Sequence, residues 1–134
     1  YGVGDPHKSY GPNRFIRQMI ESGEITLFGE GAAIRDHVFI GDVANVIVRA
    51  IMARESGVIN IASGQSISFA EMAELVCQSG SDGSHVAVVG SESLPTFRNY
   101  DISNLVKMFP DFDPVSPAVG VRQVISEIEG SDHG

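Results

Sequence analysis

The sequence is poor in cysteine and in basic charge, and it has no long hydrophobic run. Its 134 residues include one cysteine, Cys77, which excludes an intrachain disulfide framework and suits a reducing, cytoplasmic compartment. Nine Lys and Arg stand against 17 Asp and Glu, giving a net charge of −8. Because a nucleic-acid binder needs clustered basic residues, no nucleic-acid partner is expected. No apolar run approaches the roughly 18 residues of a membrane span, so no membrane partner is expected either.

Residue patterns that hold metals or dinucleotides are also missing. The four histidines are far apart and have neither cysteine nor carboxylate at ligand spacing, so no metal site is predicted: His7, His37, His85 and His133. The turn Gly29-Glu30-Gly31 leads to Ile34, where a dinucleotide-binding loop requires Gly or Ala, and an extended stretch rather than a helix follows. No cofactor-binding residue is therefore predicted in this chain, and His37 is interpreted as structural.

Helical and extended patterns alternate along the chain, which indicates an α/β fold. Expected helices begin at Pro12, at an Asp42 N-cap (spanning 43–53), at a Ser68–Glu71 capping box and at Asp101, and a last one covers 119–128. Extended segments are expected at 25–28, 34–40 and 86–89, and a fully buried strand at 58–61.

The stretch from Leu27 to Ala44 carries the clearest chemical signal. It places Arg35 beside Asp36, directly before an apolar segment. A guanidinium is planar and always charged, which suits both a carboxylate and a diphosphate. From the residues alone, Arg35 either pairs with a carboxylate such as Asp36 or holds an anion.

The same stretch resembles the L-x-G-x-G-x-x-x-R-D-x-x-x-x-x-D-V-A signature of NAD-dependent nucleotide-sugar epimerases and dehydratases, the extended short-chain dehydrogenase/reductases. Further matches follow in the family's order. Residues 1–5 are similar to Y-G-P-G-D with Val3 in place of Pro, and residues 57–64 resemble a strand-and-turn motif with Ile59 for an aromatic residue and Ala62 for Gly. Residues 67–73 and 100–105 resemble two later helical motifs, the second with Asn104 for Lys.

The resemblance implies that residues 1–134 are a single unit, the C-terminal substrate-binding portion of such an enzyme. The family's Gly-rich cofactor loop and its catalytic Tyr-x-x-x-Lys precede the Y-G-P-G-D motif. None of the three tyrosines here has Lys four residues later, since those positions are Asp5, Arg14 and Asn104. We therefore expect no catalytic residue in this chain, no turnover by it alone, and no bound cofactor. NAD(H) or NADP(H) would belong to an N-terminal domain that is absent here.

The resemblance also assigns the substrate side. Arg35 matches the family position that contacts the diphosphate of a nucleotide sugar, and Arg98 lies where many members carry a second phosphate-binding Arg. Leu27 and Phe28 match the edge that meets the nucleotide base. Asp36 and Asp42 are interpreted as structural, Asp36 as an ion-pair partner. The expected small-molecule partner is a nucleotide-diphosphate sugar.

In the family, the helix at 43–53 and the strand at 58–61 pack on the cofactor domain, and they would complete a Rossmann-type domain that is absent here. Without that domain their apolar faces would be open, so we expect self-association as a homodimer through Val46, Ile47, Ala50 and Ile59. Two alternatives remain open at this point. One is a non-catalytic binding or regulatory member of the superfamily, and the other is a stand-alone, monomeric α/β domain.

Overall fold

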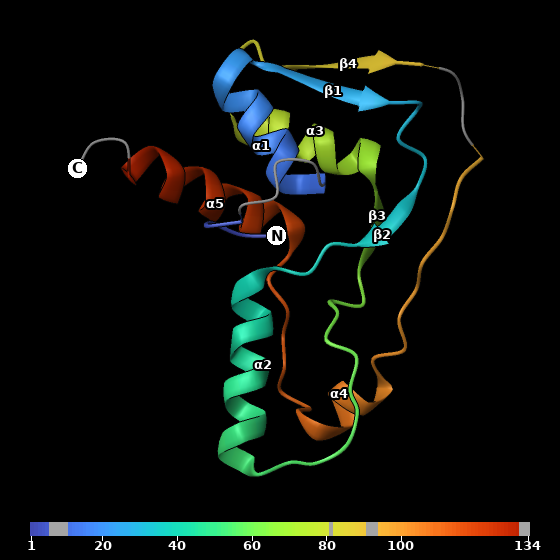
Figure 1. The fold of residues 1–134 in the computed structure, drawn as a ribbon, viewed down its shortest axis with the longest axis vertical. Coiled ribbons are helices and arrows are strands. Elements are labelled where there is room, and N and C mark those ends of the chain that lie inside the picture. Colours follow the sequence, from blue (N-terminus) through green and yellow to red (C-terminus); the bar gives the residue numbers. More distant parts are fainter. Residues whose placement is uncertain (6–10, 81, 91–93, 132–134) are drawn as a thin grey trace.

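A computed structural model describes residues 1–5, 11–80, 82–90 and 94–131. His7, Tyr10 and His133 lie outside these ranges. The elements follow the order α1 (Gly11–Ser22), β1 (Glu24–Phe28), β2 (Ile34–Asp36), α2 (Ile40–Ala53), β3 (Ser66–Ser68), α3 (Phe69–Ser79), β4 (His85–Val89), α4 (Ser103–Met108) and α5 (Pro117–Ser131). The expected α/β class is confirmed (Figure 1).

Two small sheets organise the chain. β1 and β4 pair in parallel, with Glu24 opposite His85 and Phe28 opposite Val89. β2 and β3 pair antiparallel, with Arg35 opposite Ile67. Since α3 starts directly after β3, the second sheet joins the start of α3 to the segment that carries Arg35.

Helices α1 and α3 lie beside β1 and β4, and α5 packs on α3 and α1 (Figure 1). Together they enclose the larger core, here called the upper core. The apolar stripe of α1 supplies Phe15, Ile16 and Met19, each at most 3% exposed. The capping box that opens α3 is confirmed: Ser68 accepts from the Glu71 amide, and the Glu71 carboxylate accepts from the Ser68 amide. These contacts fix the start of α3 next to β2.

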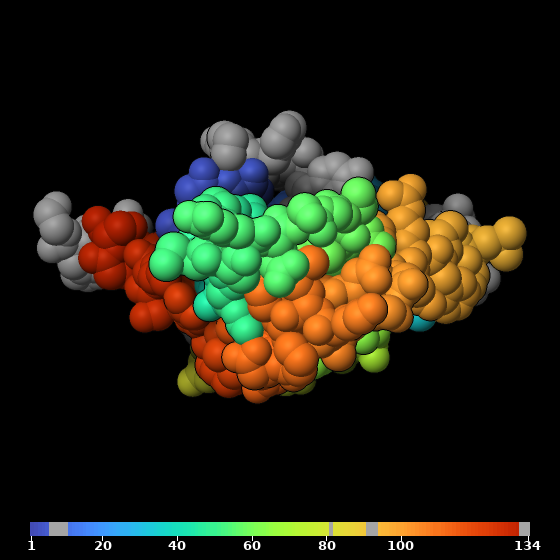
Figure 2. Space-filling model, turned by 90° about the horizontal axis from the view of Figure 1, so that it is seen from below, coloured from blue at the N-terminus to red at the C-terminus, as the bar shows by residue number. Residues whose placement is uncertain are grey.

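A second apolar group, the lower cluster, joins α2 to α4 through Val46, Leu105 and Phe109. Val46 and Leu105 are fully buried. Seen from below, α2 and the residues that follow it (green) lie against α4 and its neighbouring residues (orange) (Figure 2). The outer face of α2 is apolar and open to solvent, since Ile47, Ile51 and Met52 are 47%, 69% and 80% exposed.

Two sequence expectations for this part of the chain are wrong. Residues 58–61 form no strand, and Val58 is 85% exposed, because none of the described strands lies alongside to pair with them. Helix α2 starts at Ile40, and Asp42 is not its N-cap. The Asp42 carboxylate lies in the first turn and accepts from the Val115 amide at 2.9 Å, so it fastens the approach to α5.

Candidate functional site

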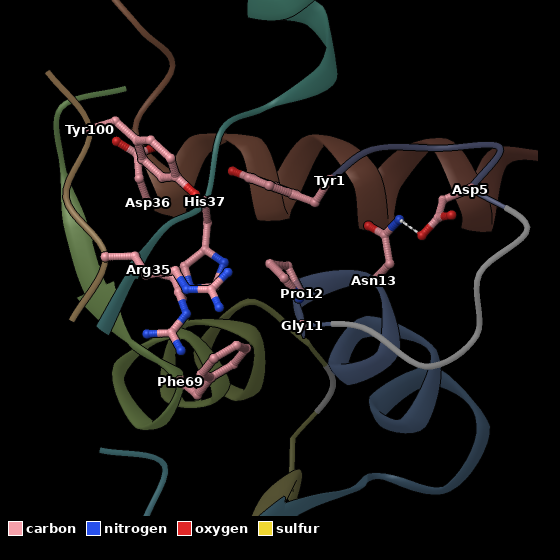
Figure 3. A pocket seen from close by; sticks show the side chains of 11 residues that line it. Tyr1, Asp5, Gly11, Pro12, Asn13, Arg35, Asp36, His37, Phe69 and Tyr100 are labelled. Atoms are coloured by element: carbon pink, nitrogen blue, oxygen red, sulfur yellow. Dashed lines mark hydrogen bonds between the residues drawn. The ribbon is translucent and has the colours of Figure 1, made fainter. Parts of the chain in front are cut away.

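A cavity of about 530 Å³ lies between α1, β2, the start of α3 and the segment before α4 (Figure 3). Its lining combines two cationic side chains with two carboxylates and with aromatic and polar groups: Arg35, Arg98, Asp5, Asp36, His37, Phe69, Tyr100, Asn13 and Tyr1. Both carboxylates have hydrogen-bond donors of their own, Asp36 from residues 63 and 64 and Asp5 from Asn13. Two positive charges beside ring faces suit an anion attached to a planar or polar group.

Arg35 reaches this cavity from β2, and its guanidinium has fixed partners. Nη1 donates to the carbonyl oxygens of Ile34 at 2.7 Å and of Thr96 at 2.8 Å. Nη2 donates to the hydroxyl oxygen of Thr96 at 2.8 Å. All three acceptors are uncharged, so the positive charge of Arg35 is not neutralised by these contacts.

The chain around Thr96 brings Arg98 to the same cavity. Ile34 and Phe97 form a parallel bridge, in which the Ile34 amide donates to the Thr96 carbonyl and the Arg98 amide donates to the Ile34 carbonyl. The main chain therefore fixes the two arginines, 63 positions apart in sequence, at one cavity. The alternation pattern gave no sign of this pairing, because it is a single isolated bridge rather than a strand.

The expected ion pair between Arg35 and Asp36 is absent from the part of the chain that the structure describes, so that expectation is wrong. Asp36 instead accepts three hydrogen bonds. Oδ1 accepts from the amide and the hydroxyl of Ser63, both at 2.9 Å, and Oδ2 accepts from the Gly64 amide at 2.7 Å. Asp36 therefore has a structural role, as expected, but with partners other than Arg35. Its carboxylate holds residues 63 and 64 beside β2.

His37 lines the cavity next to Arg35. Its ring meets Phe69 edge-on, with ring centroids 5.2 Å apart, and its Nε2 is buried with no hydrogen-bond partner among the described residues. Burial, helped by the amino group of Tyr1, lowers the pKa of His37 to about 4, although Asp36 opposes the shift. At neutral pH the cavity therefore contains an uncharged imidazole.

A second cavity, of about 220 Å³, contains the expected base-side residues Leu27 and Phe28. Leu27 is 5% exposed and also packs in the upper core, whereas Phe28 is 67% exposed. The Arg14 guanidinium lies 4.8 Å from the centre of the Phe28 ring. Gly11 and Phe69 line both cavities, so the two adjoin.

The Gly29–Gly31 turn does not fit a dinucleotide phosphate. It connects β1 to β2 rather than to a helix. A Cβ on Gly31 would lie 2.8 Å from the Ala70 amide nitrogen, and the Gly31 carbonyl accepts from that amide at 3.1 Å. Because Gly31 has no side chain, the start of α3 can lie directly against it. The helix therefore occupies the space that a phosphate would need.

Sequence reasoning missed Asn13. Its side chain is 5% exposed, accepts from the Gly2 amide at 3.1 Å, and donates to the Gly2 carbonyl at 3.0 Å and the Asp5 carboxylate at 2.8 Å. Figure 3 shows the Asn13–Asp5 contact at the edge of the first cavity. Asn13 thus fixes residues 1–5 against α1. An Asn one residue after Pro12 gives no sequence signal for such a role.

The described residues contain no group of three or more His, Cys, Asp or Glu placed to hold a metal ion. None of their helices has both the length and the apolar composition needed to cross a bilayer.

Comparison with known proteins gives matches in sequence and in fold. Residues 1–62 match the sequence model of the NAD dependent epimerase/dehydratase family. A putative GDP-L-fucose synthase 2 of Oryza sativa subsp. japonica is 38% identical over 66 residues, which span 47% of this chain and 19% of that protein.

The structural matches extend over nearly the whole chain. An NAD-dependent NDP-hexosamine 5,6-dehydratase involved in tunicamycin biosynthesis matches with a TM-score of 0.82 and 20% identity, over 97% of this chain and 43% of that one. The UDP-glucose 4-epimerase of Thermotoga maritima, solved with UDP-glucose, matches with a TM-score of 0.79 and 21% identity, over 98% and 43%. At these identities the likeness shows the fold, and the chain spans less than half of either structure.

Proposed function

We infer that this chain, a member of the NAD-dependent epimerase/dehydratase family, forms the nucleotide-sugar-binding part of a longer enzyme. Residues 1–134 are proposed as one substrate-side unit. The relatives named above include a 4-epimerase solved with UDP-glucose and an NDP-hexosamine dehydratase. The substrate class proposed for this chain is accordingly a nucleoside diphosphate attached to a sugar.

One observation supports this proposal above the others: the cavity with Arg35 and Arg98 adjoins the cavity with Leu27 and Phe28. A nucleotide-diphosphate sugar needs a cationic site for the diphosphate next to an apolar site for the base. In this proposal the two arginines hold the diphosphate, and Phe28 offers an exposed ring face to the base.

The proposed contribution of the chain is binding and orientation of the substrate. The described residues offer no tyrosine–lysine pair at the family's spacing, and the Gly29–Gly31 turn does not suit a dinucleotide. We therefore place the cofactor and the acid–base residues in another part of the enzyme, with the open face of α2 as the surface that meets it. A cytoplasmic location is proposed for the whole.

A non-catalytic binding protein of the same superfamily would use the same two cavities. It would differ in the residues outside this chain, where a Gly-rich loop and Tyr-x-x-x-Lys would be lost. A stand-alone domain without ligand is less well supported, because large apolar side chains on α2 remain uncovered.

Fluorescence or calorimetric titration of the isolated chain tests the proposal. We expect UDP, GDP or dTDP to bind more tightly than the matching nucleoside, because only the diphosphate engages the arginines. NADH is expected to show no saturable binding at micromolar concentration. Equal affinity for nucleoside and nucleoside diphosphate would contradict the substrate assignment, and tight NADH binding would contradict the placement of the cofactor site.

A further inference from the structure

The contacts of Arg35 use only part of its donor capacity. A guanidinium carries five N–H groups. Nη1 uses both of its hydrogens, on the carbonyls of Ile34 and Thr96, and Nη2 uses one, on the hydroxyl oxygen of Thr96. Within the described part of the chain, the second Nη2 hydrogen and the Nε hydrogen have no acceptor.

These two unused donors lie together on one side of the guanidinium. Thr96 supplies two oxygens to neighbouring nitrogens, 2.8 Å from each, so it lies across the Nη1–Nη2 edge. The Nε–Nη2 edge is the other edge on which two N–H groups run parallel, and parallel N–H groups are what a carboxylate or phosphate accepts in a bidentate contact. Arg35 itself lines the first cavity (Figure 3).

We propose that Thr96 is a positioning residue for anion binding: it holds one edge of the Arg35 guanidinium so that the Nε–Nη2 edge takes two phosphate oxygens of the ligand. This inference rests on the proposed function, since it assigns the anion to the diphosphate of a nucleotide sugar. Arg35 makes the contact with the ligand, and Thr96 acts through Arg35.

The surrounding backbone makes this contact rigid. The Thr96 carbonyl also accepts from the Ile34 amide at 2.8 Å, and the Ile34 carbonyl also accepts from the Arg98 amide at 3.3 Å. The side chain of Arg35 thus spans the junction between β2 and the segment that carries Arg98. Fixing its rotamers before binding removes an entropic cost that a free arginine would incur on binding.

The test compares Thr96→Val with Thr96→Ser in the full-length protein, with UDP and uridine as probes. Valine keeps the shape of threonine but removes the hydroxyl acceptor. We expect Thr96→Val to weaken UDP binding about tenfold, the size of a lost hydrogen bond to a charged group. Uridine affinity should stay within about twofold, and Thr96→Ser should restore UDP affinity. UDP binding that is unchanged or tighter in Thr96→Val would overturn the proposal.

A second readout does not depend on the ligand. Held by the Thr96 hydroxyl, the Nη2 group of Arg35 should rotate slowly about the Cζ–Nη2 bond and give separate NMR signals. These signals should average in Thr96→Val, whereas Nη1 keeps its two carbonyl acceptors. Loss of the signals in Arg35→Lys assigns them. Averaged signals in the unmodified protein would disprove the positioning role even if UDP binds. Separate signals without any preference for UDP over uridine would leave the positioning intact and contradict the proposed function.

Discussion

Under the proposed function, replacing Arg35 with alanine in the full-length protein is expected to raise the KM for a nucleotide-sugar substrate roughly 10- to 150-fold, because a charge-assisted contact contributes about 1.5–3 kcal/mol. The guanidinium lies in the larger cavity and has only uncharged partners, so its charge is available to a diphosphate. Since the diphosphate is not the reacting group, the loss should appear in KM with little change in kcat. Steady-state kinetics, or a Kd where no turnover is found, measures it.

Two variants control this experiment. Arg122→Ala removes the same charge from an exposed position on α5, and its KM should match that of the unmodified enzyme. Arg35→Lys keeps the charge without the planar fork and should fall between Arg35→Ala and the unmodified enzyme. A KM for Arg35→Ala within about twofold of the value for the unmodified enzyme would contradict a contact between Arg35 and the substrate.

The isolated 134-residue chain is expected to self-associate through the outer face of α2. Ile40, Ala44, Ile47 and Ile51 follow each other at intervals of three and four residues and are all exposed, so they form one apolar face. Burying an isoleucine contributes about 1.5–3 kcal/mol, so the double variant Ile47→Glu/Ile51→Glu should raise the dissociation constant at least about 100-fold. Analytical ultracentrifugation over a range of micromolar concentrations measures the effect.

The matched control lies on another helix. Val119 on α5 is as exposed as Ile47, both at 47%, and Val119→Glu should leave the association unchanged. In full-length protein, the same α2 variant should instead disturb the contact with the remaining chain. A monomeric isolated chain at all concentrations would show that the α2 face is stable in water and would favour the stand-alone alternative.

The structure changes which residues are expected to carry this association. The sequence pointed to Val46, Ile47, Ala50 and Ile59, because α2 is apolar on more than one face. Val46 is instead fully buried against Leu105 and Phe109, and Ala50 and Ile59 pack on the same cluster. The period of a helix shows that two faces are apolar, but it does not show which one the short helix α4 will cover.

Strong local signals were predicted well from the sequence. The Ser68–Glu71 capping box, the stripe of α1 and the strands at Ile25 and Val86 depend on neighbouring residues, and all are present. The local sequence could not predict correctly whether residues 58–61 form a strand. Their apolar pattern suits a buried strand, but it does not show whether a partner strand is present. A strand forms where another strand offers its edge, and no described strand does so here.

The sequence likewise predicted some residues of the candidate site and missed others. Motif resemblance pointed to Arg35, Arg98, Leu27 and Phe28, and the structure places them in two adjoining cavities. The residues that position them escaped the sequence argument. Thr96 lies next to the isolated bridge between Ile34 and Phe97, and a threonine in an irregular segment has no sequence pattern that marks it.

A crystal structure of the full-length protein with a bound nucleotide-diphosphate sugar is the most direct test of the central claim. The account predicts diphosphate oxygens within hydrogen-bonding distance of the guanidinium groups of Arg35 and Arg98, with the base in the adjoining cavity against Leu27 and Phe28. A diphosphate bound elsewhere, with both arginines free of the ligand, would contradict the assignment of this chain as the nucleotide-sugar-binding part.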